Sequence, residues 1–549
     1  MKASYTGKNR MIVLHIDDIQ GTVVNAQQWN PNKNIKSQQV RYTKPYNNNM
    51  YILNAQLLKL SLVLLFGCEN LYCYNIIHIF PFAPRSHKNV FDPLITELAK
   101  RGHNVTIVTS YKNSHPEKNI NEIFIEHSSS FENSKFQQDL FSSVNRHPLA
   151  TMSLFKKIFL PMCTGYLQHP KIKQLLNEGK QYDIVILNAF LNECTLATAP
   201  LLGKNIITQS PASLCTWCST ASVPQPPSYV PSLIFPYTSN MNFLQRLNNA
   251  VTIQGLQLLY KYQVLSSLQT EVAKHLPDNP SITEASKLVS LFLTNCDPVL
   301  ISPRQQMPYV VNVGGMHCQK AKPLPKDLED FVQSSGESGF IYFSLGSNAQ
   351  SRYLPDNVKK SLLDTFSKVK QKVVWKYEEE LVNGPSNVKI VKWAPQQDLL
   401  GHSKIQLFIT HGGLLSMQES VYHAVPVVAV PLFGDQGSNV ARVQELEIGV
   451  KVDFHNISGS CMLDAVNTIQ KNMLKYSALF RDRPVEPVEE AASWVEYTVK
   501  HNGAWHLKSS ADDLNFFQYF LLDIMTFILI IFISAVCLLA KFARFLAKL

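Results

Sequence analysis

The stretch WAPQQDLLGHSKIQLFITHGGLLSMQESVYHAVPVVAVPLFGDQ, residues 393–436, decides the fold. Residues 405–409 form a short apolar run that predicts a buried parallel strand, because turn residues follow it at once. A tight turn at residues 410–413 contains two glycines, and residues 414–424 have the periodicity of a helix. Free N–H groups and the helix dipole point at whatever lies at such a turn, so this unit predicts an anion-binding site. A second apolar strand, residues 425–433, follows and ends in two polar residues.

Two series of alternating strands and helices predict two α/β domains with parallel sheets and helical crossovers. The first series opens with a strand, a polar loop, an amphipathic helix and a second strand, at residues 74–81, 83–89, 90–101 and 104–109. The second series begins at Phe340 and continues through strands at residues 372–376 and 388–391. A segment punctuated by prolines, residues 298–325, marks the linker between the two series.

Several residues of the opening stretch fall at the spacing of a known protein signature. These residues are His411, Gly412, Gly413, Glu419, Pro426, Pro431, Asp435 and Gln436, with Trp393 and Gln396 upstream. The stretch resembles the signature of the animal UDP-glycosyltransferases, and its Gly-Gly-Leu-Leu-Ser form is most similar to that of insect members. The resemblance runs from about residue 76 to the C-terminus. It implies an α/β fold of the GT-B type, with two Rossmann-like domains facing a cleft and one C-terminal transmembrane helix.

The resemblance and the composition together predict a domain order. Residues 57–66 are too short an apolar run to span a bilayer but suit the core of a signal peptide, for which Met50 is a conventional start. The expected parts are an N-terminal extension that is disordered or wrongly assigned (1–49), a signal peptide (50–73), an acceptor-binding Rossmann-like domain (74–297), a linker (298–335), a UDP-sugar-binding Rossmann-like domain (336–475), a return segment to the first domain (476–515), a transmembrane helix (516–540) and a cytoplasmic tail (541–549).

The C-terminal apolar segment predicts a membrane anchor. Residues 524–540 carry no charge, and with the apolar residues before them they have the length of a transmembrane helix. Lys541, Arg544 and Lys548 follow as a cytoplasmic flank. We therefore expect a single-pass type I protein with lumenal catalytic domains. Residence in the endoplasmic reticulum membrane is implied by the resemblance.

Charge and cysteine content argue against other classes of function. The formal charge of +10 is spread along the chain, and no basic run is interleaved with aromatic residues, so we expect no nucleic-acid partner. The ten cysteines do not form the spacing of a disulfide framework. Cys215 and Cys218 form a CxxC pair, but no second pair follows at the spacing of a zinc site.

By resemblance, three residues would hold the uridine. Trp393 would stack its ring on uracil, which is worth roughly 1–3 kcal/mol for a base on an aromatic ring. Gln396 would approach the base edge or the ribose, and Glu419 would accept hydrogen bonds from the ribose hydroxyls, as an acid does in dinucleotide folds. The alternatives are that Trp393 packs in the core and that Glu419 is a solvated helix residue.

The diphosphate and the sugar would be held without a metal. The chain lacks the paired carboxylates that a Mg²⁺-dependent nucleotide-sugar site needs, so no metal and no cofactor beyond the co-substrate are expected. The resemblance assigns the diphosphate and the neighbouring contacts to Gly346, Ser347, His411, Gly412, Gly413 and Ser416. Asp435 and Gln436 would hold the sugar hydroxyls, with a strand-to-helix cap as the alternative for this pair.

His87 matches the catalytic histidine of the family, and histidine suits the task because its ordinary pKa lies near the working pH. The alternative is a solvated loop histidine. Members of the family usually place an acid to orient this residue, but Asn188 stands at that position here. An amide can hydrogen-bond an imidazole without stabilising its charged form, and Glu193, one turn further, is a substitute. A second departure is Ala424, where glycine is usual, and we expect it to be tolerated.

The leading hypothesis is a membrane-anchored, inverting glycosyltransferase. It would move a hexose, with glucose expected, from a UDP-sugar to a hydroxyl of a small lipophilic acceptor, and His87 would be the base. The alternative is a catalytically weak relative that binds a UDP-sugar or a lipophile, motivated by Asn188. A non-enzymatic membrane receptor is the third class, and no residue favours it. Assembly into a homo-oligomer stays open.

Overall fold

The computed structural model describes residues 3–7, 10–16, 24–29, 73–82, 84–112, 117–126, 138, 141, 148–190, 193–213, 225–347, 349–380, 384–454 and 466–548. The chain divides into two compact units, Met1–Tyr72 and Cys73–Leu549. In the first unit, β2 (Arg10–Ile16) pairs antiparallel with β1 (Ala3–Gly7) and β3 (Val24–Trp29). The predicted signal-peptide core and the Cys215–Cys218 pair lie outside the described residues.

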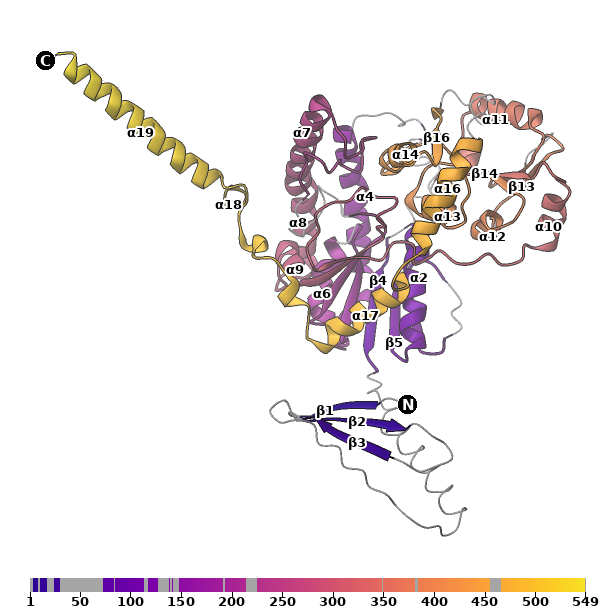
Figure 1. The fold of residues 1–549 in the computed structure, drawn as a ribbon, viewed down its shortest axis with the longest axis horizontal. Coiled ribbons are helices and arrows are strands. Elements are labelled where there is room, and N and C mark those ends of the chain that lie inside the picture. Colours follow the sequence, from indigo (N-terminus) through magenta and orange to yellow (C-terminus); the bar gives the residue numbers. More distant parts are fainter. Residues whose placement is uncertain are drawn as a thin grey trace, which may run out of the picture. The chain divides into compact units, whose positions relative to one another are not determined.

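The second unit contains a parallel sheet that forms the core of the first α/β half (Figure 1). Its strands, in spatial order, are β10 (Val310–Asn312), β9 (Val289–Thr294), β8 (Ile206–Ser210), β7 (Ile184–Asn188), β4 (Asn75–Phe80), β5 (Asn104–Thr109) and β6 (Ile120–Phe124). The central strands are buried along almost their whole length, which explains why they are continuous apolar runs rather than alternating ones.

Helices connect and cover these strands. They are α2 (Arg85–Lys100), α4 (Pro148–Gln168), α5 (Pro170–Asn177), α6 (Glu193–Leu202), α7 (Phe243–Leu259), the π-helical turn η1 (Tyr260–Leu265), α8 (Ser266–His275) and α9 (Ile282–Lys287).

The predicted polar loop at residues 83–89 is wrong, because α2 begins at Arg85. Arg85 and Asn89 are exposed and lie four residues apart, whereas Lys88 is buried. The polar residues therefore form the solvent face of the first helical turn. A run of polar residues is also typical of a loop, which explains the wrong prediction. His87 lies in this first turn rather than in a loop.

A second parallel sheet forms the core of the other half. Its strands are β13 (Val388–Val391), β12 (Lys372–Lys376), β11 (Phe340–Ser344), β14 (Ile405–Thr410), β15 (Val427–Ala429) and β16 (Gly449–Lys451). Its helices and helical turns are α10 (Lys326–Gln333), η2 (Ser351–Tyr353), α11 (Asp356–Lys368), α12 (Gln396–Leu400), α13 (Leu414–Tyr422), α14 (Gln436–Glu445) and α16 (Val466–Arg481). The predicted strand at 425–433 is shorter than expected, because Pro426 and Pro431 flank β15 and cannot donate to a ladder.

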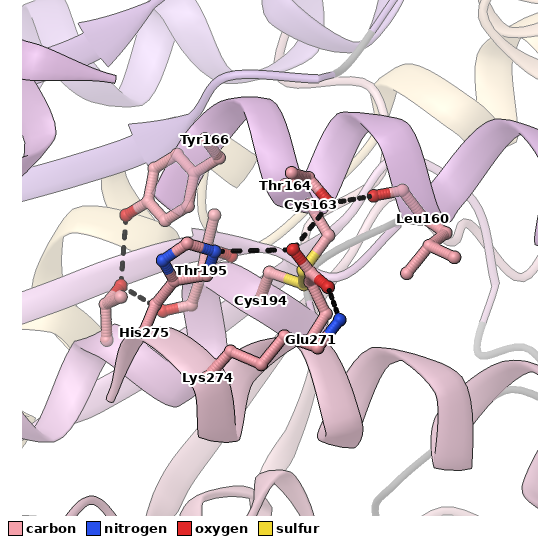
Figure 2. The surroundings of a disulfide bond; sticks show 10 residues. Leu160, Cys163, Thr164, Tyr166, Cys194, Thr195, Glu271, Lys274 and His275 are labelled. Carbon is pink, nitrogen blue, oxygen red and sulfur yellow. Dashed lines mark hydrogen bonds and ion pairs between the residues drawn. A yellow bond between two sulfur atoms is a disulfide. The ribbon is translucent and has the colours of Figure 1, made fainter. Parts of the chain in front are cut away.

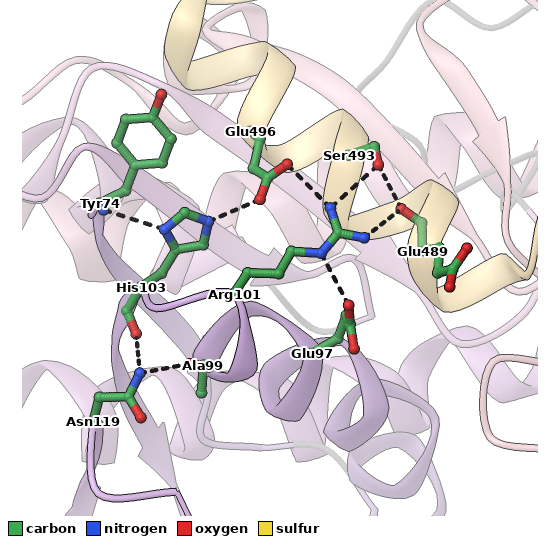
Figure 3. Close-up of polar contacts among 9 residues, drawn as sticks. All are labelled: Tyr74, Glu97, Ala99, Arg101, His103, Asn119, Glu489, Ser493 and Glu496. Atoms are coloured by element: carbon green, nitrogen blue, oxygen red, sulfur yellow. Dashed lines mark hydrogen bonds and ion pairs between the residues drawn. The ribbon is translucent and has the colours of Figure 1, made fainter. Parts of the chain in front are cut away.

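After α16 the chain returns to the first half through α17 (Pro487–Lys500). Figure 3 shows the contact: Arg101 at the end of α2 donates to Glu496 at 3.1 Å and to Ser493 at 3.3 Å. His103 pairs with the other oxygen of Glu496 at 3.0 Å. The chain that leads to the C-terminal apolar helix is therefore fastened to the first α/β half.

A disulfide joins Cys163 on α4 to Cys194 on α6 (Figure 2). Beside it, Thr164 on α4 donates to Glu271 on α8 at 2.9 Å, so three helices meet around this bond. The sequence did not predict the pair, because its members are separated by 31 residues and show no spacing pattern. Closing a loop of this length typically stabilises a fold by about 2–4 kcal/mol.

The C-terminal segment ends in two 3₁₀ turns and two helices. These are η4 (Trp505–Leu507), η5 (Ser510–Asp513), α18 (Phe516–Tyr519) and α19 (Leu522–Leu546). The last helix is long and apolar enough to cross a membrane, and none of it is buried against the described chain. The helix continues through Lys541 and Arg544, which were predicted to lie in the tail after the span.

Ala424 lies in the left-handed region, with φ of 59°, directly after His423, the C-cap of α13. An L-residue with a Cβ pays about 1–2 kcal/mol for this conformation, and glycine does not. We expect Ala424→Gly to raise the free energy of unfolding of the second half by about 1 kcal/mol, measured as a higher urea midpoint in detergent. Ala441, inside α14, is the matched control: Ala441→Gly should lower the same midpoint, because glycine in a helix interior costs about 0.5–1 kcal/mol. A fall in stability for both variants contradicts the strain at Ala424.

Candidate active site

Each sheet reverses its strand order beside its first strand, and the predicted site residues follow the strands at these points. In the first sheet the order reverses between β4 and β7, so the two connections leave in opposite directions. His87 follows β4, and Asn188 ends β7. In the second sheet the reversal lies between β11 and β14, which are followed by Gly346 and His411. Ligands of open α/β sheets bind at the carboxyl ends of strands at such points.

Two glycine turns enclose the His411 ring. A Cβ on Gly346, which has φ of 81°, would lie 2.5 Å from Cε1 of His411. A Cβ on Gly413 would lie 2.6 Å from Nε2 of the same ring. Gly412 has φ of 84° and turns the chain into α13, where Gly413 is the N-cap. The structure thus brings together the residues predicted for the diphosphate, with Ser347 half-buried beside Gly346.

The His411 imidazole is neutral at physiological pH. Its pKa is lowered to about 4, first because the ring is buried and second because of the positive charge of Lys376. The Lys376 ammonium donates to the carbonyl of Gly346 and to Glu378, both at 2.9 Å. A paired, buried cation therefore lies beside the glycine turns. His411 itself is a dipolar hydrogen-bonding group rather than a charged one.

Gln396 organises the residues predicted for the ribose. Its amide nitrogen donates to Ser416 at 3.1 Å and to the carboxylate of Glu419. Its oxygen accepts from the Tyr342 hydroxyl at 3.2 Å. Burial raises the pKa of Glu419 to about 7, and the hydrogen bond from Gln396 opposes this shift. Gln396 thus uses its polar atoms to position Glu419, and the solvated-helix alternative for Glu419 is wrong because that side chain is buried.

Trp393 is not packed in the core: 55% of its surface is exposed. The guanidinium of Arg85, in the first turn of α2, lies over the indole at 4.8 Å from the ring centroid. The ammonium of Lys376 lies 5.7 Å from the same centroid. Stacking of uracil on this ring requires either the opposite face or a movement of Arg85. The contact joins Trp393, which is predicted to stack on uracil, to the helix that carries His87.

Asp435 and Gln436 lie at the start of α14, as the cap alternative expects. The Gln436 oxygen accepts from the backbone N–H groups of Leu432 and Phe433, at 2.8 Å and 3.1 Å, and so fixes the turn before the helix. Asp435 accepts from Asn439 at 2.9 Å, and burial raises its pKa. A pocket beside Asp435 is lined by the loops after β8 and β9 and by α14. Asp435 therefore faces a space between the two halves of the chain.

His87 is oriented by an aromatic ring. Phe190 contacts the imidazole edge-to-face, with the centroids 5.2 Å apart. Asn188 holds Phe190, because its amide donates to the Phe190 carbonyl at 3.0 Å and its oxygen accepts from the Phe190 N–H at 3.3 Å. Nδ1 of His87 is buried and has no hydrogen-bond partner in the described chain. Burial lowers the pKa of His87 to about 3. The expected hydrogen bond from Asn188 to the imidazole is thus absent within the described residues.

Glu193 begins α6, next to the disulfide-bonded Cys194. Burial raises its pKa to about 7, so the carboxyl is partly protonated at neutral pH. No contact between Glu193 and His87 is present among the described residues, and its role as an orienting acid stays a prediction. In the part of the chain that the structure describes, no group of three or more His, Cys, Asp or Glu side chains is placed to hold a metal ion.

Comparison with known proteins identifies the family. The family model described as UDP-glucuronosyl and UDP-glucosyl transferase matches residues 80–549. The chain is 32% identical to UDP-glycosyltransferase UGT5 of Dactylopius coccus over 85% of this chain and 90% of that protein. It is 31% identical to UDP-glucuronosyltransferase 2A2 of Mus musculus over 82% of this chain and 90% of that protein. The chain belongs to this family. It is a UDP-glycosyltransferase and transfers a sugar from a UDP-sugar, as the sequence predicted.

Solved structures confirm the predicted fold of this UDP-glycosyltransferase. A glycosyltransferase of kitacinnamycin matches 77% of the chain and 98% of its own length, with 18% identity and a TM-score of 0.52. A UDP-glucosyltransferase from Polygonum tinctorium matches 78% of the chain and 99% of its own length, with 16% identity and a TM-score of 0.51. The two parallel sheets form the GT-B arrangement.

Three residues that contact the candidate site were not predicted from the sequence. Lys376 ends an apolar strand run, and a lone lysine at the carboxyl end of a strand next to β11 is a signal that could have found it. Arg85 and Phe190 carry no such signal, because their contacts join segments that are far apart in the sequence.

The raised pKa of Glu419 predicts pH-dependent donor binding. Ribose hydroxyls donate well to a carboxylate and poorly to its protonated form, so UDP-glucose affinity should fall as the pH decreases through about 7. A hydrogen bond to a charged group is worth about 1.5–3 kcal/mol, so the loss should be roughly tenfold or more. His317, 3.7 Å from Glu419, has its pKa lowered to about 4 by burial and does not titrate in this range.

The measurement is calorimetric binding of UDP-glucose between acidic and alkaline pH. UDP-glucose is preferable to UDP because its phosphates carry no group that titrates near neutrality. Glu419→Gln is the control and should bind weakly with a flat pH profile. A wild-type affinity that does not change across neutral pH would contradict a ribose contact by the Glu419 carboxylate.

Proposed function

We propose that the protein is a membrane-anchored, inverting transferase that moves glucose from UDP-glucose to a hydroxyl of a small lipophilic acceptor, with His87 as the base. One observation carries this proposal: Arg85, two residues before His87 on α2, lies over the ring of Trp393. The helix turn that bears the base therefore contacts the residue assigned to the uracil. A base and a donor site that meet across two domains suit a transfer between two bound substrates.

In this mechanism each group has a separate task. The acceptor oxygen attacks the anomeric carbon while neutral His87 takes its proton, and the bond from that carbon to the diphosphate breaks as UDP leaves. Attack from the face opposite the leaving group inverts the anomeric centre. The N–H groups after Gly412, the His411 imidazole and Lys376 stabilise the negative charge that develops on UDP.

The donor and the acceptor are chosen on chemistry and likeness. Relatives of similar identity include a protein named UDP-glucosyltransferase 2, 30% identical over 85% of this chain, and several named UDP-glucuronosyltransferases. Glucose is favoured because the signature takes the form found in insect members. A half-buried histidine packed against the apolar ring of Phe190 suits an apolar acceptor.

The second candidate function, a catalytically weak relative that binds the same ligands, is motivated by Asn188. Both polar atoms of its side chain are used by the main chain of Phe190. His87 then forms its charged state without a carboxylate partner, which slows proton transfer. Positioning and diphosphate stabilisation persist, so a low rate rather than no rate is the expected signature.

We also propose a lumenal, type I orientation in the endoplasmic reticulum membrane, with α19 as the anchor. The disulfide between Cys163 and Cys194 supports this, because such bonds persist in oxidising compartments. Lys541, Arg544 and Lys548 follow the apolar part of α19 and suit a cytoplasmic flank.

Turnover on microsomes containing the full chain tests the activity. UDP-glucose, UDP-glucuronic acid and other UDP-sugars are each paired with a panel of phenolic and aliphatic alcohols, and released UDP is measured. We expect UDP-glucose with a lipophilic phenol to give the highest rate and His87→Ala to abolish it. His501→Ala, at an exposed histidine, should leave the rate unchanged. Full activity of His87→Ala contradicts the mechanism. A protein that binds UDP but releases no UDP from any UDP-sugar fits the catalytically weak relative.

The contacts of Phe190 predict a shift in the pH profile. Phe190→Ala removes the ring that buries His87, so the pKa of His87 should rise toward its ordinary value. The acid limb of kcat/KM should then move to higher pH and kcat should fall, while UDP affinity stays the same. Asn188→Asp should also move this limb upward but raise kcat, because a carboxylate stabilises the imidazolium.

Phe124→Ala, on the edge strand β6, is the matched control and should leave the pH profile unchanged. Phe190→Tyr should restore most of the rate, because the ring contact is kept. If Phe190→Ala lowers kcat without moving the acid limb of the pH profile, Phe190 does not control the pKa of His87 and contributes only to folding. If Asn188→Asp has no effect and Glu193→Gln lowers kcat sharply, Glu193 is the orienting acid.

A further inference from the structure

Helix α7 presents large apolar side chains on a face that no other part of the described chain covers. Phe243, Leu247, Val251 and Leu258 are between 50% and 67% exposed. Residues of an α-helix follow one another at about 100°, so these four fall within a sector of about 80°. Leu244 lies at the border of the sector and is 71% exposed. The exposed residues thus form one stripe along the helix.

The opposite face of α7 is held firmly in the first α/β half. Its buried residues are Asn249, Thr252, Ile253 and Leu256. Asn249 accepts from the N–H of Ser232 at 2.8 Å and donates to the carbonyls of Pro227 and Val230 at 2.8 Å and 3.0 Å. The helix cannot rotate to bury its outer stripe without breaking these bonds. A helix that is apolar on both faces requires a second apolar surface.

The helix is also fixed at its far end, where η1 and α8 continue it along the outside of the first half (Figure 1). Glu271 on α8 accepts from Thr164 of α4 and from Lys274, both at 2.9 Å (Figure 2). The Cys163–Cys194 disulfide ties α4 to α6 at the same place. The stripe is therefore presented by a rigid support.

Other exposed apolar side chains do not gather in this way. Outside α7, η1 and the chain from Trp505 onward, the exposed large apolar residues of the described chain are Leu288, Trp393, Leu474, Leu479 and Val485. Single apolar residues on a surface are ordinary and need no partner. The stripe on α7 differs because its members adjoin one another on one helix face.

The charges around the stripe match an anionic lipid surface. From residue 243 to residue 265 the sequence contains no Asp or Glu, and its only charged residues are Arg246 and Lys261. Both are exposed. A helix with large apolar residues on one side and cations at the border of that side is the type that lies in the headgroup region of a bilayer.

The position of the anchor brings this half, rather than the other, to the membrane. The return helix α17 is fastened to α2 through Arg101 and Glu496 (Figure 3), and the Lys508 ammonium then donates to the Lys287 carbonyl at the end of α9. Only 13 residues lie between Lys508 and Leu522, where α19 begins. At about 3.3–3.6 Å per residue they reach at most about 50 Å, so the first half stays close to the bilayer if α19 spans it.

We infer that the apolar stripe of α7, residues 243–258 with Tyr262 of η1, is a second membrane contact that lies in the interfacial layer of the bilayer. The inference rests on the proposed anchoring by α19. The contact orients the first α/β half on the membrane surface and brings the acceptor domain to the phase in which lipophilic acceptors dissolve.

Photo-crosslinking of the full chain in proteoliposomes tests the contact. Benzoylphenylalanine replaces Leu247 or Val251, and alkyne-bearing phosphatidylcholine reports lipid adducts, with and without phosphatidylserine. We expect adducts at both positions, at least tenfold above those at Leu474, an exposed residue of α16 that serves as the matched control. Phosphatidylserine should increase the yield, because Arg246 and Lys261 border the stripe.

A crosslinking probe at Ile530 in α19 tests the proposed anchor independently of the α7 contact. Adducts at Ile530 without adducts at Leu247 or Val251 overturn the α7 contact alone, and failure at Ile530 overturns the anchor. Crosslinks from the stripe to a second copy or to another protein also overturn the lipid assignment. In a second variant, Leu258→Glu should lower adduct yield at Leu247 several-fold while UDP-glucose binding stays unchanged. An unchanged yield contradicts the inference.

Discussion

The reversal of strand order at the centre of each parallel sheet is the constraint on which the site depends. Connections from neighbouring strands leave in opposite directions at β4 and β7, and again at β11 and β14. Helix crossovers leave in opposite directions there, so a crevice for a ligand can form at these four strand ends. His87, Asn188, the first glycine turn and His411 all lie there. The strand order therefore sets the position of the candidate site, whichever side chains occupy it.

Buried polar contacts hold the two α/β halves together near their reversal points. Gln418 on α13 donates to the carbonyl of Asn295, directly after β9, at 3.0 Å. Asn295 in turn accepts from the N–H of Gly315 and donates to the carbonyl of Pro211, at 3.1 Å and 3.0 Å. Arg483, which precedes the return helix, pairs with Asp297. These bonds join α13 and the chain before α17 to the residues that follow β8 and β9.

The sequence predicted those parts of this arrangement that depend on local pattern. Short apolar runs located most central strands within one or two residues, as at 372–376 and 104–109, and the spacing of the signature gave the family. Contacts between distant segments were not predictable in this way. The pairing of Cys163 with Cys194 and the ring contact of Phe190 depend on how α4, α6 and the loop after β7 pack. Gln396 was assigned to the ligand by resemblance, and its hydrogen bonds with Tyr342 and Ser416 were not predictable because these residues belong to other elements.

Burial, rather than an excess of charge, sets the electrostatics of the site. It lowers the pKa of His87 and of His411, so both imidazoles are neutral near neutral pH, and it raises the pKa of Glu419 to about 7, so that carboxyl is only partly ionised. Lys376, a buried cation beside the glycine turns, is already paired with Glu378. A diphosphate that binds here therefore meets mainly oriented dipoles: N–H groups, the start of α13 and a neutral imidazole. Such groups need no reorganisation as charge moves onto the leaving UDP, and they act most strongly where water is excluded.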